Sequence, residues 1–326
     1  MRFKGIAVLL LNQVPIILFL AVFVTLGCMS DRFLELQNLT NILIQSSSLA
    51  VAAIGMTFVL LTAGVDLSVG SVMFVAVAVS GKFIFHGYPL SLGMMAGLLA
   101  GLLVGAINGL LVVRLRVAAF IATLAMLFIV RGFGLWLTNT RAMNMPESVT
   151  LFGASNFLGV PTPVLAMLCV ALSAHVFLAA TAWGRQIYAI GFDREAARKA
   201  GVQVSALLML SYVICGLCAA LAGLIALSQT GAVSPTFGSQ REFAAIAAAV
   251  LGGTSLFGGR GNILPGTLFG SILFQTVENG LVILNADPYL YPIIVSVIIF
   301  FAVLLDTTRN QLVSRLTRRT IRSKFE

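Results

Sequence analysis

Hydrophobic residues follow one another in long windows along most of the chain, and polar residues rarely interrupt them. A helix needs roughly 20 apolar residues to cross a bilayer, and most of the windows approach or exceed that length. Because the windows are continuously apolar rather than alternating, they favour helices over a β-barrel. We predict about ten transmembrane helices, at approximately residues 6–27, 42–63, 67–85, 90–113, 117–138, 162–182, 205–227, 243–258, 263–284 and 289–305.

The eighth window, residues 243–258, is short and rich in glycine, so we predict a broken or re-entrant helix there. No change in composition along the chain marks a boundary between domains. The sequence therefore predicts an all-α integral membrane protein in which residues 1–326 form a single transmembrane domain.

Charged residues are scarce and collect at the ends of the predicted spans. They make up 10% of the chain, whereas a soluble domain carries about 25%. The net charge is +9, and if the N-terminus is cytoplasmic, most of the 20 lysines and arginines fall on the cytoplasmic side, as the positive-inside rule requires. We therefore expect both termini in the cytoplasm. The basic tail at residues 306–326 is expected to contact lipid headgroups rather than nucleic acid.

Glycine recurs every four residues in GMMAGLLAGLLVGAINGLL, from Gly93 to Gly109. On a helix this spacing makes one smooth stripe, which lets another backbone approach closely. We expect the stripe to pack against neighbouring helices, and a pore-lining stripe is the alternative. Asn108 lies beside the stripe and is a candidate to hydrogen-bond another helix or a polar solute.

The segment LTAGVDLSVGS, residues 61–71, places Asp66 between two glycine-containing turns in a nearly uncharged region. A carboxylate at bilayer depth is costly and is normally functional or paired. Asp66 or Ser68 could cap the following helix, and the alternative is that Asp66 lines the translocation pathway. A similar break recurs in LGGTSLFGGRG, residues 251–261, and paired glycine breaks indicate a site or gate built from broken helices.

Other polar side chains inside the predicted spans extend the set of pathway or gate candidates, which comprises Gln45, Asp66, Ser68, Asn108, Gln275 and Asn279. The sequence contains no GxxxxGK[ST] phosphate loop and no HExxH motif. We therefore expect no ATP hydrolysis by this chain, no catalytic residues, and no metal or cofactor. Chains of intramembrane carboxylates, which many proton-driven carriers contain, are also missing.

One short charged segment, GFDREAARKAGV at residues 191–202, separates two stretches without Asp, Glu, Lys or Arg. Asp193 is expected to cap a helix, and Gly201 fits its C-terminal stop. Glu195 precedes Lys199 by four residues, a spacing that stabilises short helices. An ordinary solvated connection is the alternative interpretation, but a preformed helix at the membrane surface suits docking on a soluble partner.

The sequence EAARKAG within this segment resembles the core of the cytoplasmic loop in permeases of ABC importers. The longer pattern is more specific, because four motifs occur in the order typical of one class: GMTFVLLTAGVDLSVGS (55–71), GRQIYAIGFDREAARKAGV (184–202), CGLCAALAGLI (215–225) and EFAAIAAAVLGGTSLFGGRG (242–261). Over about residues 40–306 the chain resembles the ribose/galactose class of monosaccharide ABC permeases. This resemblance implies a type II ABC importer-like fold in a bacterial inner membrane.

The resemblance also implies a division of labour among several proteins. In that family the permease pairs with a second, identical or different permease, a separate cytoplasmic ATPase hydrolyses ATP, and a periplasmic binding protein delivers the sugar. A coupling helix, at about residues 191–203 here, inserts into a groove of the ATPase. The residues that match it are Asp193, Glu195, Ala196, Ala197 and Gly201.

The implied mechanism is alternating access, in which ATP closes the ATPase subunits and the coupling helices move with them. Within the same class, a branched-chain amino-acid or autoinducer permease is the alternative. From a different class, the alternative is an ion-coupled secondary carrier or a channel. The chain departs from the resemblance at one point, because Ala63-Gly64 stands where many relatives have two glycines, and this could alter local packing.

Overall fold

The computed structural model describes residues 14–294, 296–298, 300–301 and 304, and for residues 14–18 and 288 it describes the backbone alone. The beginning of the first predicted span, the end of the tenth and the basic tail at 306–326 lie outside the described residues. The chain forms two compact units. The smaller contains Met1–Leu39 and Thr276–Glu326, and the larger contains Thr40–Gln275.

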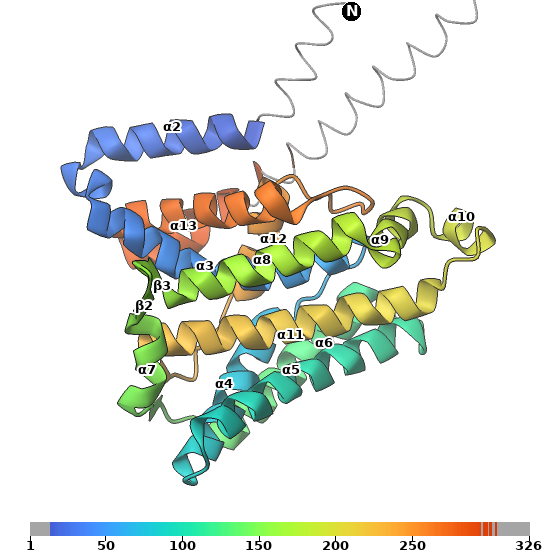
Figure 1. The fold of residues 1–326 in the computed structure, drawn as a ribbon, viewed down its shortest axis with the longest axis horizontal. Helices are drawn as coiled ribbons and strands as arrows, with labels where there is room; N and C mark the ends of the chain where they lie inside the picture. The colour runs from blue at the N-terminus through green and yellow to red at the C-terminus, as the bar shows by residue number, and fades with distance from the viewer. Residues whose placement is uncertain (1–13, 295, 299, 302–303, 305–326) are drawn as a thin grey trace, which may run out of the picture. The chain divides into compact units, whose positions relative to one another are not determined.

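The described chain is mostly helical (Figure 1). Its α-helices are α2 (Val14–Met29), α3 (Leu36–Leu61), α4 (Val69–Phe85), α5 (Leu90–Val113), α6 (Ala119–Thr138), α7 (Glu147–Ala154), α8 (Thr162–Ala180), α9 (Ala182–Phe192), α10 (Arg194–Lys199), α11 (Val204–Thr230), α12 (Arg241–Leu251) and α13 (Leu268–Ile283). The chain also contains two short 3₁₀ helices, η1 (Asp31–Leu34) and η3 (Pro288–Leu290), and a π-helix, η2 (Ile263–Thr267), and its described residues after Leu290 are helical. Within the larger unit, α5, α6, α8 and α11 appear in Figure 1 as long rods running in similar directions.

Four two-residue strands lie in the loops of the larger unit. Strand β1 (Met143–Asn144) pairs antiparallel with β4 (Ala232–Val233), so that Met143 is opposite Val233. Strand β2 (Asn156–Phe157) pairs antiparallel with β3 (Val160–Pro161). Together with α7, strands β1, β2 and β3 give regular structure to the connection between α6 and α8.

Five described helices are long and apolar enough to cross a membrane, namely α3, α5, α6, α8 and α11. Helix α4 and residues 19–29 are shorter apolar helices. The prediction of a mostly helical membrane protein is therefore confirmed. The exterior of these helices carries many exposed apolar side chains, including Phe128, Ile129 and Trp136 of α6, as expected for surfaces in contact with lipid.

Helix α3 occupies the interior of the larger unit. Every residue from Ser46 to Leu61 is buried, and the sequence of this stretch is apolar or small on all sides. A helix that is hydrophobic all round is stable either against lipid or inside a protein core, and the burial of α3 places it in the core. The end of α3 and the turn that follows it are therefore held in a densely packed environment.

The glycine stripe of α5 packs against two neighbouring helices. A Cβ added at Gly97 would overlap the Ala76 carbonyl oxygen of α4, and a Cβ at Gly105 would lie 2.5 Å from the Tyr212 carbonyl oxygen of α11. Gly109 faces Met209, so the C-terminal half of α5 meets the N-terminal half of α11 and the two helices run antiparallel. The predicted packing role of the stripe is confirmed.

The predicted break in the eighth span is present, but the helical range 243–258 is wrong in its second half. Helix α12 ends at Leu251, and no regular helix follows until η2 begins at Ile263. Glycines in this loop adopt positive φ angles, for example +92° at Gly253 and +84° at Gly258. Such conformations favour glycine and cannot continue a right-handed helix, which is why the helix stops early.

Candidate functional site

The segment predicted as a coupling helix, at about residues 191–203, contains the last two residues of α9 and the whole of α10, which meet at Asp193. The Asp193 backbone is extended, with φ −157° and ψ 108°. Its Oδ1 accepts hydrogen bonds from the backbone N–H groups of Glu195 at 2.9 Å and Ala196 at 3.0 Å. These N–H groups have no carbonyl partner inside α10, so the carboxylate satisfies them. The predicted helix cap at Asp193 is confirmed.

Helix α10 ends at a glycine in the left-handed region. Gly201 has φ +83°, and its N–H donates to the Arg198 carbonyl oxygen at 3.0 Å. The Val202 N–H donates to the Ala197 carbonyl oxygen at 3.1 Å. This pair of bonds closes the last turn in a Schellman motif. The predicted stop at Gly201 is confirmed, and both ends of α10 are fixed by its own residues.

The charged face of α10 is open to solvent. The Glu195 carboxylate forms an ion pair with Arg198 at 3.1 Å, and both side chains are about two-thirds exposed. The sequence spacing pointed instead to Lys199 as the partner, but the side chain three residues along lies closer on this short helix. Ala197 is buried, whereas Ala196 is exposed. Helix α10 therefore presents a charged surface that little else in the described chain covers.

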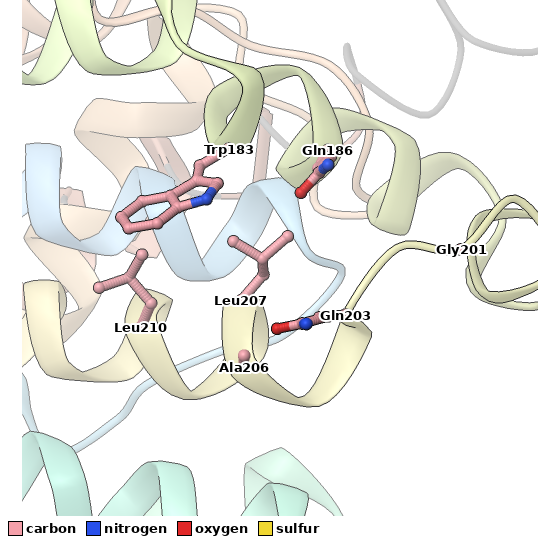
Figure 2. A pocket seen from close by; sticks show the side chains of 7 residues that line it. All are labelled: Trp183, Gln186, Gly201, Gln203, Ala206, Leu207 and Leu210. Carbon is pink, nitrogen blue, oxygen red and sulfur yellow. The ribbon is translucent and has the colours of Figure 1, made fainter.

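A hollow of about 490 Å³ lies beside this segment, between α9 and the first turns of α11. In Figure 2 the Trp183 indole and Leu210 lie on one side of the hollow, and the amides of Gln186 and Gln203 lie nearer Gly201. Trp183 is 56% exposed. An indole at the boundary of an apolar wall and a polar rim is typical of residues at a membrane–water interface.

Two side chains of α9 and α10 reach other parts of the larger unit. The Tyr188 hydroxyl of α9 donates to the Gly261 carbonyl oxygen at 2.9 Å. The Arg194 guanidinium of α10 donates through Nη2 to the Thr62 carbonyl oxygen at 2.9 Å. Burial raises the pKa of Tyr188, so its hydroxyl remains protonated and able to donate at neutral pH. Sequence reasoning missed both residues.

Asp66 lies in the turn between α3 and α4, and its side chain is 1% exposed. Its Oδ1 accepts hydrogen bonds from the Ser68 N–H at 2.9 Å and from the Ser68 hydroxyl at 2.6 Å. Asn108 of α5 donates through Nδ2 to both carboxylate oxygens, at 3.2 and 3.3 Å, and to the Ser68 Oγ at 2.8 Å. The structure thus brings Asp66, Ser68 and Asn108 together in one cluster, which we call the Asp66 cluster.

The predicted side-chain cap on α4 is not formed, and Asp66 and Ser68 instead belong to a buried network of hydrogen bonds. Ser68 is the N-cap residue of α4, and its own hydroxyl caps no N–H of that helix. Asp66 instead orders the turn that leads into α4. The Asn108 Oδ1 has no hydrogen-bond partner among the described residues, and neither has the buried hydroxyl of Tyr212. The cluster therefore keeps free hydrogen-bonding capacity next to a fully buried carboxylate.

The remaining pathway candidates form amide pairs. In the larger unit, Gln275 donates through Nε2 to the Gln45 Oε1 at 3.1 Å. In the smaller unit, Asn279 donates to the Asn38 Oδ1 at 2.9 Å and accepts from the Asn38 Nδ2 at 3.1 Å. The reciprocal bonds of this second pair could not be foreseen, because Asn38 lies far from Asn279 in the sequence.

The described residues contain no group of three or more His, Cys, Asp or Glu side chains that could hold a metal ion. Cys215 and Cys218, which form a CxxC sequence, are both buried and free.

Comparison with known proteins gives a consistent result. The family described as "Branched-chain amino acid transport system / permease component" matches residues 38–305. The ribose import permease protein of Escherichia coli (strain K12) is 40% identical over 306 residues, covering 92% of this chain and 95% of that protein. No solved structure matches the chain.

The names of other relatives refer to different solutes. The fructose import permease protein of Rhizobium meliloti is 37% identical over 90% of this chain and 84% of its own length. The autoinducer 2 import system permease protein of Enterobacter sp. (strain 638) is 35% identical over 94% of this chain and 90% of its own length. The match extends over nearly the whole chain in each case. The chain therefore belongs to the transport-system permease family that includes the ribose import permeases.

Proposed function

We propose that this chain is the permease subunit of an ABC importer that carries a monosaccharide across a bacterial inner membrane. The observation that carries the proposal is the 40% identity to a ribose import permease along 92% of the chain. The doubly capped α10, whose charged face is exposed, supports it, because a helix with ordered ends suits docking on a partner. In this proposal the chain is a transport subunit without catalytic residues, and a partner ATPase hydrolyses ATP.

The proposed assembly contains two permeases, a cytoplasmic ATPase and a periplasmic binding protein. We propose ten transmembrane helices in one domain, with both termini in the cytoplasm. The antiparallel packing of α5 and α11 supports this orientation, since it places Arg114 and Arg116, which follow α5, at the same end of the pair as α10. Basic residues gather on the cytoplasmic side of bacterial membrane proteins.

We propose that α10 is the coupling helix and that Asp193, Glu195, Ala196, Ala197 and Gly201 form its ATPase-docking element. The exposed Glu195 carboxylate offers the charge that an ATPase groove can recognise, and the caps hold it in place. The translocation pathway or gate is proposed to involve Gln45, Asp66, Ser68, Asn108, Gln275 and Asn279. Because Asp66 is buried, a solute can reach it only after the surrounding helices have moved.

Reconstitution into proteoliposomes tests the proposed function. Uptake of radiolabelled ribose, used as the probe, is expected to require the ATPase, ATP and the binding protein together. Uptake by this chain alone under a proton or sodium gradient would show that it is an ion-coupled carrier. Competition with unlabelled fructose, autoinducer 2 and leucine separates the solute classes, and inhibition by leucine alone would assign the chain to branched-chain amino-acid import.

Substitutions in α10 test the docking element. Glu195→Lys is expected to lower ATP-driven uptake about tenfold, which corresponds to about 1.4 kcal/mol of lost interaction, while membrane insertion is unchanged. Gly201→Val should act in the same direction, because a β-branched residue is strained at φ +83°. The matched control is Glu147→Lys, the same charge change at an exposed glutamate of α7. Normal transport by both α10 variants would refute the docking assignment.

A further inference from the structure

Three segments that are far apart in the sequence meet in backbone contact at the end of α9. The Gly259 N–H donates to the Leu61 carbonyl oxygen at 2.9 Å. Gly191 lies against this bond, because a Cβ at position 191 would overlap both the Leu61 carbonyl oxygen and the Gly259 nitrogen. Close-packed backbone of this kind has no flexible side chain to absorb a displacement. Movement of one segment must therefore shift the other two.

Two side chains fasten the same contact. The Tyr188 hydroxyl donates a hydrogen bond to the Gly261 carbonyl oxygen, and the Arg194 guanidinium donates one to the Thr62 carbonyl oxygen. Thr62 immediately follows the last residue of α3, so the guanidinium meets the carbonyl end of that helix, where a positive charge is stabilising. The segment α9–α10 thus holds one carbonyl group on each of the other two segments.

The two segments held in this way are the glycine-interrupted breaks at 61–71 and 251–261. The first leads from Thr62 to the Asp66 cluster and the start of α4. The second leads from α12 to η2 and α13. The sequence indicated these breaks as a gate, and the structure adds that both contact the segment that carries α10. A displacement of α10 therefore has a direct route to each break.

We propose that Tyr188 and Arg194 are positioning residues that convey the movement of α10 to both glycine-interrupted segments during transport. The inference rests on the proposed role of α10 as the coupling helix. The Tyr188 hydrogen bond moves the 251–261 break with the α9–α10 segment, and the Arg194 hydrogen bond moves the turn that contains Asp66. Neither residue is required for docking of the ATPase, since their hydrogen bonds point into the permease and not to the exposed face of α10.

Two control variants test whether the loss of a cation or of a hydroxyl group at another position has the same effect. Arg185 is an exposed arginine of α9, so Arg185→Met removes a cation from the same segment and leaves the hydrogen bonds to both breaks in place. Tyr88 is an exposed tyrosine in the loop between α4 and α5, so Tyr88→Phe removes a hydroxyl elsewhere. The test variants are Arg194→Met and Tyr188→Phe.

The experiment measures uptake of ribose and hydrolysis of ATP in the same proteoliposomes, with the complete transporter and its binding protein. Each test variant is expected to reduce the ratio of ribose imported to ATP hydrolysed about fivefold, the change that corresponds to a hydrogen bond of about 1 kcal/mol. The ATPase should co-purify with both variants as it does with the unsubstituted permease. Arg194→Lys, which keeps a donor, should restore most of the ratio.

The outcomes distinguish this inference from the proposed function. If Glu195→Lys uncouples transport while Tyr188→Phe and Arg194→Met keep the normal ratio, α10 remains the coupling helix and the positioning role is refuted. If the test variants lose the ATPase during purification, the two residues act in docking and the positioning role is again refuted. The inference is supported if both test variants retain the ATPase but import less ribose per ATP hydrolysed, while the two control variants keep the normal ratio.

Discussion

Asp193 and Asp66 make the same local hydrogen bond in two different environments. Each aspartate accepts, through Oδ1 at 2.9 Å, the backbone N–H of the residue two positions ahead. Asp193 lies at the exposed start of α10, where water can replace any bond that the protein loses. Asp66 is 1% exposed and receives additional bonds from Asn108, a residue of another helix. The bond is shared, but its surroundings differ.

The difference shows that burial, rather than the hydrogen bond itself, decides what each aspartate does. An exposed cap adds a modest local stabilisation, and its loss is felt mainly within the helix it begins. A buried carboxylate leaves its donors unsatisfied when it is removed, and their desolvation is not recovered. Asp193 is therefore suited to hold a docking element, and Asp66 is suited to tie α5 to the turn before α4.

The largest effect is expected from removal of the buried carboxylate. Asp66→Ala leaves the Ser68 hydroxyl and the Ser68 N–H without their acceptor and leaves the Asn108 amide with only the Ser68 Oγ, so the free energy of unfolding should fall by about 3 kcal/mol. The melting temperature of the detergent-solubilised protein, followed by size-exclusion chromatography after heating, measures the loss. Asp31→Ala, at an exposed aspartate, is the control and should change little.

A double variant separates the cluster from a general loss of packing. Asn108→Ala removes the amide that faces Asp66, so the loss in Asp66→Ala/Asn108→Ala should be smaller than the sum of the two single losses. Additive losses would mean that the two residues do not act through their mutual hydrogen bond, and the comparison with Asp193 would then lose its basis.

A smaller and local effect is expected at the exposed aspartate. Asp193→Ala removes the acceptor for two N–H groups of α10 and should destabilise this helix by about 1 kcal/mol. Hydrogen exchange of the α10 amides should accelerate about fivefold, and the melting temperature of the whole protein should stay unchanged. A large fall in melting temperature would show that this cap supports the whole fold and not only the local order of the proposed docking element. Asp193→Ser, which keeps a capping oxygen, is the matched control.

The same contrast explains what could be predicted from the sequence. The caps at Asp193 and Gly201 involve residues at most five positions apart, so the sequence pattern was sufficient to predict α10 and its ends. Asp66 was recognised as unusual, but its contact with Asn108 depends on how α5 packs. The hydrogen bonds of Tyr188 and Arg194 to the glycine breaks join residues still farther apart in the sequence, so no local sequence pattern could predict them.

The smallest expected effect concerns Ala63, which lies in the turn between α3 and α4, three residues before Asp66. Its φ of +58° places an L-residue in the left-handed region, which costs about 1–2 kcal/mol relative to a right-handed conformation. Glycine removes this cost but loses conformational entropy on folding, so Ala63→Gly should raise the free energy of unfolding by about 0.5 kcal/mol. Ala125→Gly, in the middle of α6, should instead lower it by about 1 kcal/mol, because glycine disfavours a helix. Thermal melting of the two variants in parallel measures both signs.

If Ala63→Gly is stabilising yet lowers the ratio of solute imported to ATP hydrolysed, the strained turn beside Thr62 contributes stiffness to the proposed route from Arg194 to Asp66. If Ala63→Gly lowers the melting temperature as Ala125→Gly does, the turn at Ala63 is not strained in the native protein.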